Sequence, residues 1–154
     1  MPAHEHHATI AWRLGDEDFP RGRYSRAHEW RFDGLSVPAS AAPGNVPKPF
    51  ARTDALDPEE AFVAALSSCH MLTFLDIARR AGFVVASYED DAVGFLEEIA
   101  PQRRGITRVT LRPRIAWHGT PPDAARLDAL HHQAHETCFI ANSVTTTVTV
   151  EKPA

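Results

Sequence analysis

Residues 57–69 run DPEEAFVAALSSC, and this stretch opens the helix around which the rest of the chain is organised. Asp57 can cap the free amides, Pro58 suits the first helical position, and Glu60 completes a capping box three residues after the cap. Apolar residues then recur at helical spacing up to a basic end that is closed by Gly82. The sequence therefore predicts a central helix of about six turns with little solvent face.

The sequence on either side of this helix is typical of strands, because it alternates in polarity or is rich in β-branched residues. We expect strands at residues 9–14, around the turn signal Asp33-Gly34 within 24–35, at 83–97, at 106–117 and at 144–150, with a turn at 103–105. Pro121-Pro122-Asp123 predicts the start of a second helix that runs to about Thr137. This order predicts an α+β fold, with helices packed on a mainly antiparallel sheet.

Length and local composition predict the organisation of the chain. The 154 residues, 17.0 kDa in all, fit a single domain over residues 1–154. Residues 1–8 (MPAHEHHA) are expected to be a disordered start. Residues 37–54 are rich in proline, alanine and glycine, which predicts a long loop, and such loops tend to be functional or mobile.

Charge and hydropathy exclude several classes of protein. With a net charge of −4 and a pI near 6.1, the chain lacks the overall positive charge that would hold it on nucleic acid. The apolar stretches are expected to be too short and too interrupted to span a membrane. Residues 1–8 lack the basic start and apolar run of a secretory signal, which predicts a cytoplasmic protein. In that reducing compartment a permanent disulfide is disfavoured, whereas a transient catalytic one is allowed.

The two cysteines, Cys69 and Cys138, each have an inert interpretation and a reactive one. Either can be a small buried apolar residue. A reactive Cys69 needs a cation nearby, since the thiolate is the nucleophile and the dipole of a helix end does not reach its middle. His70 should point about 100° away from Cys69 around the helix, so the activating cation is expected to be an arginine from elsewhere. Cys138 ends the second helix, and spacing does not reveal whether the two cysteines meet.

A metal site is an alternative for the second helix. His131, His135 and Cys138 fall at positions i, i+4 and i+7 and so share one helix face. They offer three zinc ligands and lack a fourth. The N-terminal histidines could also bind metal adventitiously, or they could simply belong to a frayed terminus: His4, His6 and His7.

Two segments together resemble the OsmC/Ohr family of hydroperoxide reductases. In residues 57–69 a Pro-Glu pair precedes an alanine-rich helix, with a cysteine ten residues after Glu59. In residues 134–144 (AHETCFIANSV) a cysteine closes a helix, and a serine-containing turn leads to the final strand. The resemblance covers about residues 9–152. Phe139 stands where the best-studied members carry proline, which places the chain in an outlying branch.

The resemblance implies a function and a set of site residues. It implies an OsmC-like intertwined homodimer that reduces organic hydroperoxides with thiols, without a metal or cofactor. Cys69 is similar to the peroxidatic cysteine, Cys138 to the resolving one, and Glu59 to a carboxylate that orients an arginine. The best match for that arginine is Arg26, eight residues before Gly34, and Arg23 and Arg31 stay open. The implied reductant is an external dithiol, often a dihydrolipoyl protein.

Helix geometry adds a condition to this implication. Glu59 and Cys69 lie about 15 Å apart along a straight helix, so they cannot form one site within it. A dimer interface or a bend in the helix would bring them together. The apolar helix face, with Phe62 and Phe74, favours an organic hydroperoxide over hydrogen peroxide. The alternatives are a metal-binding protein and a non-catalytic, ligand-binding member of the same fold.

Overall fold

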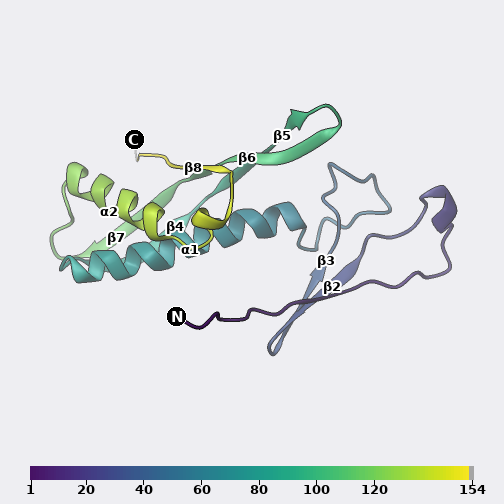
Figure 1. The fold of residues 1–154 in the computed structure, drawn as a ribbon, viewed down its shortest axis with the longest axis horizontal. Coiled ribbons are helices and arrows are strands. Elements are labelled where there is room, and N and C mark those ends of the chain that lie inside the picture. Colours follow the sequence, from purple (N-terminus) through teal and green to yellow (C-terminus); the bar gives the residue numbers. More distant parts are fainter. Residues whose placement is uncertain (153–154) are drawn as a thin grey trace. The chain divides into compact units, whose positions relative to one another are not determined.

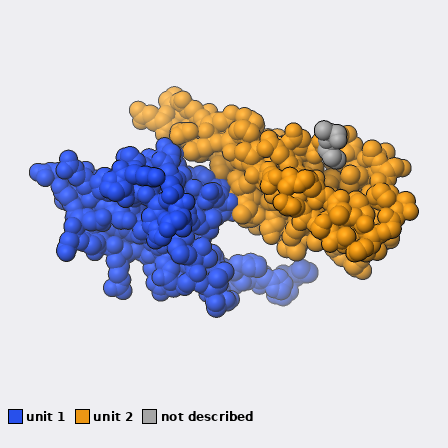
Figure 2. All heavy atoms as spheres, turned by 180° about the vertical axis from the view of Figure 1, so that it is seen from behind, with its two compact units in different colours: residues 1–61 blue, residues 62–154 orange. Residues whose placement is uncertain are grey.

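The computed structural model describes residues 1–152, and its internal contacts divide the chain into two compact units, which Figure 2 colours separately. The first unit comprises residues 1–61 and the second begins at residue 62, so the long helix α1 starts in the first and continues through the second. The expectation of a single domain stays a prediction. The elements in chain order are β1 (Thr9–Ala11), η1 (Phe19–Arg21), β2 (His28–Phe32), β3 (Leu35–Ala39), α1 (Pro58–Arg80), β4 (Val84–Asp90), β5 (Val93–Ala100), β6 (Arg103–Leu111), β7 (Pro113–His118), α2 (Ala124–Thr137), η2 (Ala141–Ser143) and β8 (Thr147–Val150).

The first unit holds a three-stranded antiparallel sheet in the order β1-β2-β3. The predicted turn at Asp33-Gly34 is confirmed, because Gly34 has φ of 73°, a left-handed conformation that favours glycine. The loop predicted from residue 37 begins only after Ala39. Residues 37–39 pair with β2, and Pro38 is accommodated because β3 is an edge strand.

Helix α1 begins and ends as the sequence predicts. The Glu60 amide donates to Asp57 Oδ1 at 2.8 Å, and the Asp57 amide donates to Glu60 Oε2 at 3.3 Å, which is the predicted capping box. At the other end Gly82 has φ of 85°, and the Phe83 amide donates to the Ala78 carbonyl at 3.0 Å. Local chemistry therefore fixes both ends of the helix.

The prediction that α1 has little solvent face is wrong for the single chain. Its buried residues recur every four positions and form one stripe: Leu66, His70, Phe74 and Ala78. Leu72, on another face, is 61% exposed. The strands and α2 pack against one side of α1, so much of its apolar surface is left uncovered by this chain.

The expectation that no apolar stretch could span a membrane also needs correction. By length and composition α1 is long and apolar enough to do so. A single helix of this kind is a weak indication, since core helices of water-soluble proteins have the same composition.

The strands of the second unit form a β4-β7 pair and a β5-β6-β8 sheet. The two long strands expected over 83–97 and 106–117 are each broken, at residues 91–92 and at Arg112. Asp90 Oδ1 accepts from the Arg112 amide at 2.6 Å and ties the two breaks together. The turn lies at Pro101-Gln102 rather than at 103–105, which belong to β6. β8 runs parallel to β6, and the β4-β7 and β5-β6 pairings are antiparallel, so the mainly antiparallel arrangement is confirmed.

Helix α2 packs along α1, and this packing fixes where α2 ends (Figure 1). Asp123 caps α2 by accepting from the Arg126 amide at 2.7 Å, as predicted. One core cluster joins α1 to α2 and to strands β4 and β7; its buried members are Phe74, Ala78, Leu130 and Ala134. A second cluster packs the first half of α1 on β6 and β8; its buried members are Leu66, Val109 and Leu111.

Close packing between α1 and β5 predicts that Gly94 tolerates no side chain. A Cβ at Gly94 would lie 2.5 Å from Val63 Cγ2, and β-branched valine has little rotamer freedom in a helix. We expect Gly94→Ala to lower the free energy of unfolding by about 1–3 kcal/mol, measured by urea denaturation. Gly105→Ala is the matched control, because its Cβ would meet its nearest atom at an ordinary 3.5 Å. Equal losses in both variants would contradict this packing.

Candidate active site

The structure brings the two cysteine thiols together. Cys69 lies in the middle of α1 and is half-buried, whereas Cys138 caps the C-terminus of α2 and is fully buried. Both are free thiols, and Cys69 lies close enough to Cys138 to raise the pKa of its thiol. The packing of α2 on α1 thus answers the question that sequence spacing leaves open.

The two thiols differ in their environment. Burial raises the pKa of the Cys138 thiol, the neighbouring Cys69 side chain raises it further, and the Ala141 amide, 3.5 Å from Cys138 Sγ, opposes the shift. The raised pKa favours the protonated form of Cys138. Cys69 is the more accessible of the two sulfurs.

Around Cys69, the sequence-based expectation is met for His70 but not for Phe74. His70 bonds to His131 rather than to Cys69, in line with the expected rotation away from the sulfur. Phe62 is half-buried and packs beside Leu66. Phe74, expected to favour an organic substrate, is fully buried in the core against Tyr88 and Trp117, so its ring has no surface open to a substrate.

A buried histidine pair, which sequence analysis did not find, lies at the same helix interface. His70 Nε2 and His131 Nδ1 are 3.0 Å apart, and the two rings stack with centroids 5.3 Å apart. The Phe74 ring stacks on the His131 ring, with 4.4 Å between the ring centroids. Burial, aided by the nearby His131 and His135, lowers the pKa of His70 to about 4. Burial likewise lowers the pKa of His131 to about 4, against the opposing charges of Asp128 and Asp90. Both imidazoles are neutral at pH 7.

The alternative metal site does not form in this structure. Within residues 1–152, no three His, Cys, Asp or Glu side chains gather closely enough to hold a metal ion. His131 directs Nδ1 to His70, and Cys138 directs its thiol to Cys69, so the shared helix face does not bring these groups to a common point.

The two other predicted site residues, Arg26 and Glu59, belong to the first unit. Glu59 Oε1 accepts from Asn45 Nδ2 at 3.0 Å. The Arg26 guanidinium lies 3.6 Å from the centre of the Tyr24 ring and donates to the carbonyls of Gly22 and Tyr24. Within the first unit, none of the ion pairs or hydrogen bonds among the described residues joins Arg26 to Glu59. The roles of both residues stay predictions.

Arg26 lies in an aromatic hollow of the first unit. This hollow has a volume of about 500 Å³, and its walls include Trp12, Phe19 and Tyr24. The three rings contact one another at centroid distances of 4.5–5.9 Å. Of the two other candidate arginines, Arg31 pairs with Glu29 at 3.2 Å and Arg23 is exposed beside Asp18. Arg26 is thus the candidate with an apolar site around it.

Comparison with known proteins identifies the family. The sequence profile described as OsmC-like protein matches residues 51–152. The chain belongs to the OsmC-like protein family. An OsmC-like protein of unknown function from Vibrio cholerae has 49% sequence identity and a TM-score of 0.93, over 97% of this chain and 99% of that one.

Two more distant structures of the family share the fold. An organic hydroperoxide resistance protein from Elizabethkingia anophelis has 18% identity and a TM-score of 0.72, over 99% of both chains. An organic hydroperoxide resistance protein OsmC from Legionella pneumophila has 18% identity and a TM-score of 0.70, over 99% of this chain and all of that one. No curated protein matches the sequence. The predicted family and the predicted α+β fold are confirmed, and the homodimer stays a prediction.

The histidine pair predicts a loss of stability in mild acid. The imidazoles titrate near 6.5 when the chain is unfolded and near 4 when it is folded, so the unfolded state binds more protons between these values. The free energy of unfolding should fall as pH drops from about 6.5 to about 4, by on the order of 3 kcal/mol for each imidazole. Urea denaturation at several pH values measures it.

Substitution of the pair supplies the control for this prediction. The double variant His70→Phe/His131→Phe should flatten the pH dependence, because phenylalanine does not titrate. His132→Phe, at an exposed position of α2 beside Glu136, should leave it unchanged. A double variant that keeps the wild-type slope would show that other groups carry the effect.

Proposed function

We propose that this protein is a thiol-dependent peroxidase that reduces organic hydroperoxides to alcohols. The observation that carries the proposal is the proximity of a half-buried Cys69 and a fully buried Cys138, both of them free thiols. A two-cysteine peroxidase needs such an arrangement, with one sulfur open to the peroxide and a second held beside it. Cys69 acts as the peroxidatic cysteine and Cys138 as the resolving cysteine.

The chemistry proceeds in three balanced steps. The Cys69 thiolate attacks one oxygen of the peroxide, the O–O bond breaks, and the departing alkoxide takes up a proton to leave as the alcohol. The sulfenic acid on Cys69 then condenses with the Cys138 thiol, which forms the disulfide and releases water. An external dithiol, such as a dihydrolipoyl protein, reduces the disulfide by exchange and is itself oxidised. The proposed reaction needs no metal or cofactor.

The class of substrate is supported by the apolar surroundings and by the family. Members at 18% identity are named for organic hydroperoxide resistance. The aromatic hollow around Arg26 suits the organic part of a hydroperoxide, and its guanidinium suits the oxygen atoms. Hydrogen peroxide has no apolar part that could use this hollow. We place the reaction in the cytoplasm, where reduced dithiols are available.

The proposed mechanism requires a cation, and a homodimer can supply it. Neutral His70 cannot stabilise a thiolate on Cys69, and Cys69 is too far from the start of α1 to use the helix dipole. The exposed Leu72 on α1, together with Ile10 and Leu35 in the first unit, leaves apolar surface for a second copy to cover. We propose an intertwined homodimer in which Arg26 and Glu59 of one chain serve Cys69 of the other.

The cysteine variants test the reaction itself. Cys69→Ser should abolish turnover of cumene hydroperoxide with dihydrolipoamide, because the nucleophile is lost. Cys138→Ser should still consume one equivalent of peroxide, with a sulfenic acid on Cys69 that a dimedone adduct reveals by mass spectrometry. A Cys69→Ser protein with undiminished turnover would overturn the proposed function.

Mixed dimers test whether Arg26 acts across the interface. Arg26→Ala should lower kcat/KM by about tenfold or more, because it removes one positive charge that stabilises the thiolate. Arg23→Ala and Arg31→Ala are the matched controls and should have a smaller effect. When Arg26→Ala and Cys69→Ser chains are refolded together, half of the dimers hold one intact site, which should restore about a quarter of wild-type activity. No restoration, with mixed dimers present by mass spectrometry, would mean that Arg26 acts within its own chain or not at all.

A further inference from the structure

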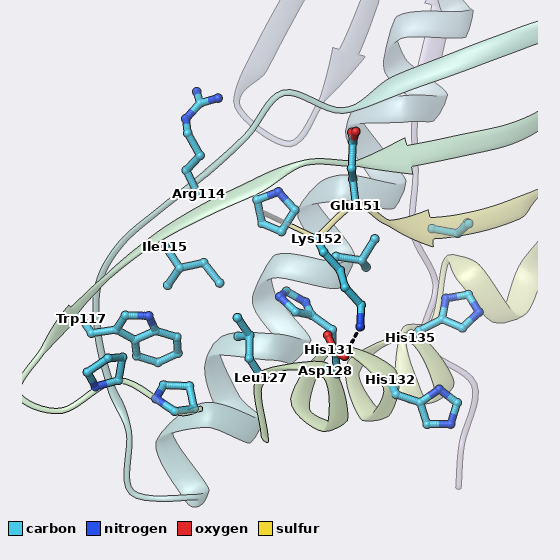
Figure 3. A pocket seen from close by; sticks show the side chains of 15 residues that line it. Arg114, Ile115, Trp117, Leu127, Asp128, His131, His132, His135, Glu151 and Lys152 are labelled. Carbon is cyan, nitrogen blue, oxygen red and sulfur yellow. Dashed lines mark hydrogen bonds and ion pairs between the residues drawn. The ribbon is translucent and has the colours of Figure 1, made fainter. Parts of the chain in front are cut away.

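The second unit contains a cavity that is separate from the Cys69–Cys138 pair. This α2 pocket has a volume of about 610 Å³ and is bounded by β7, β8 and α2 (Figure 3). Its apolar wall is formed by Ile115, Trp117, Leu127, Val148 and Val150. Neither cysteine lines it. The size and the apolar lining are those of sites that bind small organic molecules.

A single buried polar side chain, His131, belongs to the lining of this pocket. It is 8% exposed, and its Nδ1 is engaged by His70. Its other nitrogen, Nε2, makes none of the hydrogen bonds found among the described residues. The protonation of this nitrogen therefore decides what His131 offers to a ligand.

The histidine pair determines that protonation. One proton lies between His70 Nε2 and His131 Nδ1, and each neutral ring carries one N–H. His70 Nδ1 is buried without a partner among the described residues. A buried N–H without an acceptor is rarer and more costly than an unused lone pair. The favoured arrangement leaves the lone pair on His70 Nδ1, so His70 donates to His131 and His131 presents Nε2–H to the pocket.

The charges around the pocket are already compensated. Lys152 pairs with Asp128, Glu151 pairs with Arg112, and Arg114 pairs with both Glu89 and Asp91. His132 pairs with Glu136 at the outer side of α2. Each Asp, Glu, Lys and Arg side chain of the described lining therefore has an ionic partner, and His135 adds a half-buried imidazole. The electrostatics therefore favour a neutral ligand over a carboxylate or an amine.

We propose that the α2 pocket binds a neutral, mainly apolar organic molecule through one hydrogen-bond acceptor, such as a carbonyl oxygen, which receives the Nε2–H of His131. Trp117, Ile115 and Leu127 surround the apolar part of the molecule (Figure 3). This site is independent of the proposed peroxidase reaction, because it includes neither cysteine. A ligand here contacts the histidine that holds α2 against α1.

A matched pair of ligands tests the proposal on the unmodified protein. Acetophenone and ethylbenzene have nearly the same shape, but only acetophenone carries an acceptor oxygen. Titration of the isotope-labelled full chain, followed by NMR, should shift the Trp117 indole and His131 ring signals with both ligands. Acetophenone should bind about threefold to tenfold more tightly, the value of one hydrogen bond. Equal affinities, or shifts that leave Trp117 and His131 unaffected, would overturn the proposal.

Two variants place the ligand within the pocket. Leu127→Trp fills the cavity and should weaken binding of both ligands by at least tenfold, an order-of-magnitude estimate from excluded volume, while Leu14→Trp in the first unit should not. His131→Phe keeps an aromatic ring stacked on Phe74 but removes the Nε2–H donor. The affinity for acetophenone should therefore fall to the affinity for ethylbenzene. Binding that Leu127→Trp does not weaken would place the ligand elsewhere and would contradict the assignment, whatever the peroxidase activity.

Discussion

The packing of α2 against α1 is the constraint on which the rest of the second unit depends. Phe74 and Ala78 on α1 meet Leu130 and Ala134 on α2, and all four side chains are fully buried or nearly so. The two alanines let the helix backbones approach closely, while Phe74 and Leu130 supply most of the buried apolar volume. This one interface sets the position of Cys138 beside Cys69 and of His131 beside His70.

The two polar contacts at this interface make opposite demands on charge. The histidine pair is stable only while both rings are neutral, and burial keeps them so. The thiol pair has to hold a negative charge on one sulfur if it is to react with a peroxide. Partial exposure of Cys69 and full burial of Cys138 distinguish the two thiols, because desolvation raises the pKa of Cys138 and so favours its protonated form.

The features that were predictable from sequence are those with local causes. The ends of α1 and the start of α2 follow from Asp57, Gly82 and Asp123, whose chemistry acts within four residues. The breaks in the long strands were not predictable, because they depend on Asp90 bonding to a backbone amide 22 residues away. The exposed face of α1 was missed for a related reason: an apolar sequence does not reveal whether its own chain or another copy covers it.

The candidate site likewise has a part that local sequence predicts and a part that depends on tertiary packing. Sequence motifs single out Cys69 and Cys138, but their contact depends on helix packing that no spacing reveals. His131 was considered only as a zinc ligand, because helical periodicity shows which residues share a face and not which partner they meet. Its true partner, His70, is at a position that sequence analysis had considered only in relation to Cys69.

The state of His70 also bears on where the proposed activation of Cys69 would come from. A protonated imidazole next to the reactive cysteine would stabilise a thiolate, and such pairs are common in thiol enzymes. Here burial lowers the pKa of His70 to about 4, and its ring faces His131, so at neutral pH it carries no charge to offer. Charge stabilisation therefore requires a group outside this helix interface. A guanidinium satisfies that need, because it stays protonated wherever it is placed, and Arg26 in its aromatic hollow is the arginine with room for an organic peroxide beside it.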